Sequence, residues 1–182
     1  MAIEDMTRYH ETRFTTWDLA NIYGPAEDFI GKFRLKLSTL KGKEELDKVA
    51  YGCRGLMSET YYFKTKEPSI SELNALSLRK YKKMIDKWDG WSLFQQLLST
   101  LNRMAQKYNV NIANVATRYI LDKPAVAGVI IGVRLGIVDH RSSNMQVFNF
   151  SLTKSDYDDI DVVCTKSNNL FETIGDCGDE YR

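Results

Sequence analysis

Apolar residues recur along most of this chain at the spacing of an amphipathic helix. The clearest case runs from Trp91 to Tyr108, where apolar side chains fall three or four positions apart. The same spacing predicts a helix over residues 26–37, directly after Pro25, a residue that suits a first helical turn. The basic stretch over residues 76–88 also predicts an amphipathic helix. Most of the sequence is therefore expected to be helical.

Polar residues at helix-start positions predict further helices. Asn111 can cap one helix, which Pro124 can stop, and Thr153 can cap another that continues to about residue 167. A short helix is expected over residues 139–149. Two stretches with mixed charges and little apolar content are expected to be loops, residues 38–48 and 60–74.

Three short runs predict buried strands instead. They are β-branched or apolar, and most end at a glycine: residues 14–18, 49–52 and 126–132. Continuous runs of this kind are typical of parallel strands covered on both faces. The alternation of strands and helices predicts an α/β fold, although three strands are few for this many helices.

Composition and charge narrow the classes of function. The chain has 182 residues, 43% of them hydrophobic, which suits one domain on a prior of about 150 residues per domain. Lys and Arg number 25 against 24 Asp and Glu, so the net charge is +1. A balance this even predicts neither a nucleic-acid partner nor an anionic membrane partner.

Cysteine usage and the chain start point to a reducing compartment. The three cysteines are far apart and odd in number, which indicates thiols and no disulfide framework. The first residues carry early acids and no apolar run, unlike a signal peptide. No apolar run approaches the roughly 20 residues of a membrane span. We expect a cytoplasmic protein without a metal site.

The first candidate for chemistry is a carboxylate and a phenol near one predicted strand end. Asp18 ends the strand and Tyr23 follows in the next loop. Catalytic groups of parallel α/β folds collect at the carboxyl ends of strands. A tyrosine can act as a general acid if a neighbour such as a lysine lowers its pKa from about 10. The alternative is an aspartate that stabilises a turn and a tyrosine packed under a loop.

The second candidate is a phosphate-binding segment. The predicted strand ends at Gly132, Arg134 follows, and a helix opens near residue 139. Backbone N–H groups, the dipole of that helix and an arginine fork favour a bound anion. An ordinary surface arginine is the alternative. No Gly-rich dinucleotide fingerprint or P-loop lysine follows a strand, so neither a Rossmann domain nor an NTPase is indicated.

Two further motifs allow a ligand. Tyr51 stands at a strand end before a glycine-rich turn, where a planar ring could stack on it, although a buried packing tyrosine is the commoner case. The basic run Arg79–Lys83 could contact phosphates, but a solvated helix face is the simpler interpretation.

The motifs together resemble a known family. The run Phe14–Glu27 resembles the second strand and following loop of the aldo-keto reductase superfamily, and Ile131–Asn144 resembles its eighth strand and cofactor-binding helix. The segment Leu121–Gly128 and the tail Gly175–Arg182 are similar to a plant and bacterial branch of that family. The resemblance covers about residues 1–37 and 49–182, with the motifs in family order.

The resemblance implies an NADPH-dependent carbonyl reductase that acts on a small-molecule carbonyl substrate. In the family, an aspartate, a tyrosine, a lysine and a histidine form a catalytic tetrad. Tyr23 would be the proton donor and Asp18 would support the lysine. The cofactor contacts would be Tyr51 on the nicotinamide ring, Gly132 beside the nucleotide, Arg134 on the 2′-phosphate and Asn144 at the adenine. His140 stands where the family often has arginine or glutamine.

The sequence also departs from the family. The tetrad lysine and histidine belong to strands that would lie between residues 37 and 49, and the chain is too short there to contain them. The residues after Met1 resemble part of the first helix, with no first strand before it. We therefore expect an incomplete TIM (β/α)8 barrel with about three parallel strands covered by helices.

This interpretation treats residues 1–182 as a single partial domain. Residues 1–37 would be the second-strand region, residues 38–48 a junction, and residues 49–182 the seventh- and eighth-strand region with the C-terminal helices. Open sheet edges would favour self-association. Two functions stay open: an active reductase, or an inactive chain that retains weak NADP(H) binding or acts through protein contacts.

Overall fold

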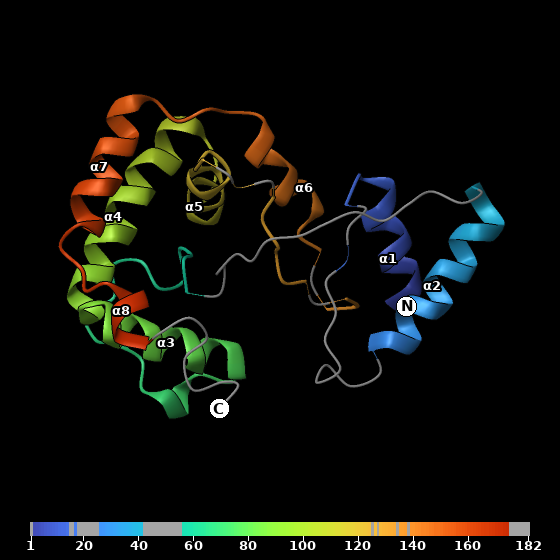
Figure 1. Cartoon of the computed structure of the whole chain (residues 1–182), viewed down its shortest axis with the longest axis horizontal. Helices are drawn as coiled ribbons and strands as arrows, with labels where there is room; N and C mark the ends of the chain where they lie inside the picture. Colours follow the sequence, from blue (N-terminus) through green and yellow to red (C-terminus); the bar gives the residue numbers. More distant parts are fainter. Residues whose placement is uncertain are drawn as a thin grey trace. The chain divides into compact units, whose positions relative to one another are not determined.

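A computed structural model gives the fold of most of the chain (Figure 1). It describes residues 2–14, 17, 26–41, 56–124, 126, 128–133, 135–137 and 139–174. The chain divides into two compact units, each with its own internal contacts. Unit 1 comprises Met1–Gly52 and Leu121–Met145, and unit 2 comprises Cys53–Ile120 and Gln146–Arg182.

Unit 2 is a helical assembly built around its longest helix. That helix is α4, Gly90–Tyr108, and the cartoon shows α7 beside it (Figure 1). Helix α4 packs against α7 and α3, and α8 contacts α3. The other elements of the unit are the short 3₁₀ helices η2 and η3 and four α-helices: η2 Ile70–Glu72, α3 Leu76–Trp88, α5 Ile112–Leu121, η3 Gln146–Phe148, α7 Lys154–Cys164 and α8 Leu170–Ile174.

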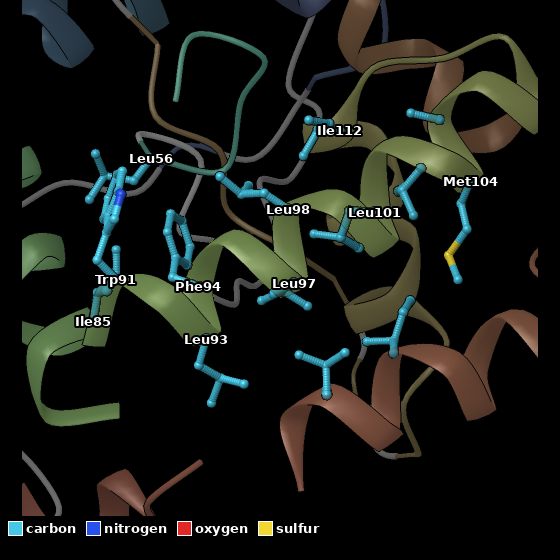
Figure 2. Packing of buried hydrophobic residues seen from close by; sticks show 14 of the residues in the cluster. Leu56, Ile85, Trp91, Leu93, Phe94, Leu97, Leu98, Leu101, Met104 and Ile112 are labelled. Carbon is cyan, nitrogen blue, oxygen red and sulfur yellow. The ribbon is translucent and has the colours of Figure 1, made fainter. Parts of the chain in front are cut away.

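The core of unit 2 forms because α4 buries one continuous apolar stripe (Figure 2). Leu98 and Met104 on this stripe are fully enclosed. Helix α5 adds Ile112 and Val115, and α7 adds Ile160. Burial of a Leu or Ile side chain contributes about 1.5–3 kcal/mol, so this cluster is the main source of the unit's stability.

Hydrogen bonds at helix ends explain why these helices begin where the sequence predicts. The Asn111 side chain accepts from the Asn114 N–H at 2.8 Å at the start of α5. Thr153 and Asp156 form a reciprocal capping box at the start of α7. The predicted caps of both helices are therefore confirmed.

The same Asp156 carboxylate joins α7 to the end of α4. It is buried, and it accepts hydrogen bonds from Lys107 Nζ at 2.9 Å and from Tyr108 Oη at 2.5 Å. Burial alone would raise its pKa, but the bonds from Tyr108, Lys107 and Thr153 outweigh burial and hold the pKa well below its ordinary value. Asp156 is therefore ionised and fully bonded at neutral pH.

The basic run over residues 79–83 is partly turned inward. Lys82 is 4% exposed and pairs with Asp86 at 2.5 Å and Glu67 at 3.2 Å. Burial would lower the pKa of Lys82, but these two carboxylates raise it. Arg79 donates from Nε to the Leu73 carbonyl at 2.7 Å. Arg79 and Lys82 therefore hold the segment before α3 in place. They neither lie on a fully solvated helix face nor point outward for the phosphate contact that the sequence allowed.

Unit 1 pairs two helices, α1 (Ala2–Glu11) and α2 (Ala26–Lys41), and also contains α6 (Arg141–Met145). An aromatic cluster joins the first two helices. Phe33 of α2 is completely buried, with its ring centroid 5.5 Å from that of Trp17 and 6.0 Å from that of His10.

The predicted helices over residues 26–37 and 76–88 are confirmed, but other boundaries differ. Helix α2 continues to Lys41, so residues 38–41 are helical where a loop was expected. They contain no Gly or Pro to stop the helix, and the first glycine after them is Gly42. The expected helix over residues 139–149 is the five-residue α6 followed by a 3₁₀ turn.

The predicted strands are not formed as strands in the part of the chain that the structure describes. Within residues 126–132, Ile130 alone makes a β-bridge. Phe14 and Trp17 of the first run lie outside any strand, and the rest of that run and residues 49–52 lie outside the described residues. A strand needs a ladder to a neighbouring strand, and an apolar run by itself does not supply one. The described fold is helix-rich.

Candidate functional site

The structure describes two of the six predicted site residues. Gly132 and Asn144 both belong to unit 1. The other four lie outside the described residues: Asp18, Tyr23, Tyr51 and Arg134. The geometry therefore bears on the cofactor-binding segment around residues 132–144.

Gly132 and Asn144 present opposite environments. Gly132 is exposed, and a methyl group at its Cα would meet no other atom within 4 Å. The backbone beside it is therefore open to a ligand. Asn144 is 1% exposed, and its N–H donates to the His140 carbonyl at 2.7 Å within the turn that opens α6. A helix as short as α6 has little macrodipole, so the predicted helix-dipole contribution to anion binding is small.

Helix α1 holds the loop between these two residues. The Asp5 carboxylate accepts a hydrogen bond from the Gly136 N–H at 2.5 Å. Gly136 has φ +76°, which a residue with a side chain would adopt only with strain. One turn further along α1, the Tyr9 hydroxyl accepts from the His140 N–H at 3.4 Å. Tyr9 is buried, so its hydroxyl has a fixed position.

A tight ion pair precedes α6. Arg141 donates from Nη2 to Asp139 Oδ2 at 2.6 Å and from Nε to Asp139 Oδ1 at 2.9 Å. These side-chain bonds, with one from the Arg141 N–H, lower the pKa of Asp139 to about 2. The Arg141 guanidinium also lies over the Tyr9 ring, 5.8 Å from its centroid.

A pocket of about 290 Å³ lies between α1 and this loop. Its walls carry two acids and two bases, together with Tyr9 and the turn at Gly136 and Ile137: Asp5, Asp139, Arg8 and Arg141. Arg8 contacts Asp5 at 3.3 Å, so each base has an acidic partner. Among the described walls of this pocket, both arginines and both aspartates are therefore engaged in ion pairs with one another.

The sequence did not predict that Asp5 or Tyr9 belongs to this region. Neither stands at a predicted strand end, and the cofactor-binding motif around residues 132–144 begins more than 120 residues further along the chain. A weak signal was present, because Asp5 and Tyr9 lie one helical turn apart and share one face of α1.

Two further kinds of feature are absent from the described residues. They contain no group of three His, Cys, Asp or Glu side chains placed to hold a metal ion. None of the described helices is both long enough and apolar enough to cross a bilayer.

Comparison with protein families decides the relationship. Residues 49–164 match the family model described as the Aldo/keto reductase family, well over half of the chain. The chain belongs to the aldo/keto reductase family. No curated protein matches it.

Membership in the aldo/keto reductase family supports an oxidoreductase with NAD(P)H as cofactor and small carbonyl compounds as substrates. The family fold is a TIM barrel, and the described part of this chain shows helices without its strands. The match includes Tyr51, Gly132, Arg134 and Asn144, whereas Asp18 and Tyr23 precede it.

Proposed function

We propose that this aldo/keto reductase family member binds NADPH and reduces a small-molecule carbonyl to an alcohol. The observation that carries the proposal is that the family match spans all four residues assigned to the cofactor: Tyr51, Gly132, Arg134 and Asn144.

Two described residues support a ligand contact in this segment. Gly132 leaves its backbone uncovered, so a ligand can approach it closely. Asn144 is buried and held by the turn that opens α6. When bound, NADPH would supply the hydride.

The roles of the remaining residues rest on the family resemblance. Tyr23 donates a proton to the carbonyl oxygen, and Asp18 has the family position that supports the tetrad lysine. Tyr51 stacks on the nicotinamide ring, and Arg134 pairs with the 2′-phosphate of NADPH. The fold proposed with these roles is an incomplete (β/α)8 barrel.

Binding is tested at two glycines of the same segment. Gly128 and Gly132 both have open space where a Cβ would stand, so Gly→Ala should leave folding intact at either position. NADPH titration by fluorescence should show weaker binding for Gly132→Ala and for Arg134→Ala, and unchanged binding for Gly128→Ala. Equal affinity in the wild type and Arg134→Ala would contradict the proposed site.

Turnover is tested at Tyr23. NADPH oxidation with a panel of aldehydes should be lost in Tyr23→Phe and retained in Tyr62→Phe, a control that removes a hydroxyl from unit 2. No oxidation by the wild type with any aldehyde would reject the reductase.

A second candidate is an inactive chain that binds NADP(H) without turnover. It is favoured because no lysine matches the tetrad by motif and the sequence has two histidines, neither at a tetrad position. His140 is exposed, and the His10 ring packs edge-on to Phe33 between α1 and α2. Saturable NADPH binding without Tyr23-dependent oxidation would favour this candidate over the reductase.

Self-association and a cytoplasmic location complete the proposal. Open sheet edges of a partial barrel would pair with a second copy. Light scattering over a concentration series tests self-association. A measured mass equal to that of one chain at every concentration would contradict it.

A further inference from the structure

The loop over residues 136–141, of which the structure describes 136–137 and 139–141, is fixed to α1 at two points. The Asp5 carboxylate accepts a hydrogen bond from the Gly136 N–H at 2.5 Å, and the Tyr9 hydroxyl accepts one from the His140 N–H at 3.4 Å. Both bonds join residues 131 positions apart, so the loop runs along one face of α1 in the same direction as the helix. Because one acceptor is a carboxylate, the first bond is charge-assisted and stronger than the second.

The tethers matter because the described side chains of the loop add little apolar packing. The pocket of about 290 Å³ separates α1 from the loop, and Ile137 of the loop is 73% exposed. A loop without close apolar contacts moves when its hydrogen bonds are removed. The position of the loop therefore depends on Asp5 and Tyr9.

The loop leads directly into the residue assigned to the adenine. The His140 carbonyl accepts from the Asn144 N–H at 2.7 Å, while the His140 N–H is held by Tyr9. Arg141 begins α6 and lies over the Tyr9 ring. Asp5 and Tyr9 thus reach Asn144 through one continuous set of contacts.

We propose that Asp5 and Tyr9 are positioning residues for NADPH, because they fix the 136–141 loop and through it the placement of Asn144. The inference rests on the proposed cofactor function. Neither side chain contacts the cofactor in this role. They set the affinity by keeping the binding segment in one conformation before the ligand arrives.

The test compares two charge-removing variants of the same helix. Asp5→Asn keeps the size of the side chain and weakens the bond to Gly136, whereas Glu11→Gln removes an exposed carboxylate of α1. NADPH affinity is measured by fluorescence titration, and exchange of the Gly136 and His140 amides is followed by NMR without NADPH.

We expect Asp5→Asn to raise the dissociation constant of NADPH about tenfold and to speed exchange at Gly136 by a similar factor. Glu11→Gln should change neither. Asp5→Glu keeps the carboxylate and should recover part of the affinity. Tyr9→Phe should speed exchange at His140 and weaken NADPH binding less than Asp5→Asn does.

Binding stoichiometry separates positioning from misfolding. A purely structural defect lowers the number of sites and leaves the dissociation constant of the remaining sites unchanged. That pattern, or an NADPH affinity of Asp5→Asn equal to that of Glu11→Gln, would overturn the inference. A wild-type chain that binds no NADPH would overturn the proposed function itself, and the inference with it.

Discussion

Unit 2 and unit 1 are held together in different ways. Unit 2 has a continuous cluster of 16 buried apolar residues spread over α4 and its neighbours. Among the described residues of unit 1, the buried apolar side chains are Met6, Tyr9 and Phe33, and hydrogen bonds attach the loop before α6 to α1. Both described site residues, Gly132 and Asn144, belong to unit 1.

The difference separates stability from function. The buried apolar stripe of α4 contributes much of the free energy that stabilises unit 2. Neither of the described site residues belongs to that unit. In unit 1, two hydrogen bonds from α1 hold the loop that precedes α6, which is part of the proposed binding segment. Variants in the two units should therefore fail in different ways.

The largest effect is expected from Phe33→Ala. Phe33 is completely buried between the rings of His10 and Trp17, so its removal should cost about 3–5 kcal/mol. Hydrogen exchange followed by mass spectrometry should show rapid exchange in α1 while α4 stays protected. An equal loss of protection in α4 would show that the two units unfold as one.

Leu98→Ala is the matching change in unit 2. Leu98 lies fully buried on α4, and its truncation should destabilise the unit by about 2–5 kcal/mol. Here α4 and α7 should lose protection while α1 retains it. The control is Val162→Ala on the exposed side of α7, which should change unfolding by less than about 0.5 kcal/mol.

Asp156→Asn should destabilise unit 2 by about 1–3 kcal/mol at neutral pH, since charge-assisted bonds to Lys107 and Tyr108 are weakened. The pKa of Asp156 is lower in the folded chain, so its contribution is fully present above about pH 4 and is lost as the pH falls below that value. Urea unfolding at pH 7 and pH 3 should show a smaller acid loss for Asp156→Asn than for the wild type. Equal losses would contradict this role.

The smallest effect concerns the exposed ion pair of unit 1. Because the Arg141 guanidinium is the largest cause that lowers the pKa of Asp139 to about 2, Arg141→Gln should raise that pKa toward its ordinary value, while the backbone N–H of residue 141 still donates to the carboxylate. An NMR titration of the Asp139 carboxyl measures both values. A pKa that stays near 2 in the variant would show that another group sets it.

The sequence predicted the helices of unit 2 well because local signals specify them. The apolar period of α4, the Asn111 cap of α5 and the Thr153 cap of α7 all act within a few residues. Helix α8 has five residues, too few for a period to be visible. The predicted strand over residues 126–132 is the opposite case, since its described residues make only a β-bridge at Ile130. An apolar run cannot indicate whether a partner strand exists.

The candidate site was predictable only in part. Gly132 and Asn144 were found from a motif that lies within one segment of the chain. Asp5 and Tyr9 were missed because their contacts with Gly136 and His140 join distant parts of the sequence. Nothing in the sequence around a polar residue of an amphipathic helix indicates that its side chain will accept a hydrogen bond from a distant backbone N–H.

The equal separation of 131 residues in the two α1–loop bonds has a consequence for how this chain tolerates insertions and deletions. A change of length in a connection between the helices, such as the segment over residues 60–69, leaves both pairs of partners in the same register. Its entropic cost grows only slowly with the length of the intervening chain. One residue added within 137–139 would instead misalign Gly136 and His140 with α1, so this contact tolerates a longer connection elsewhere but not a longer loop.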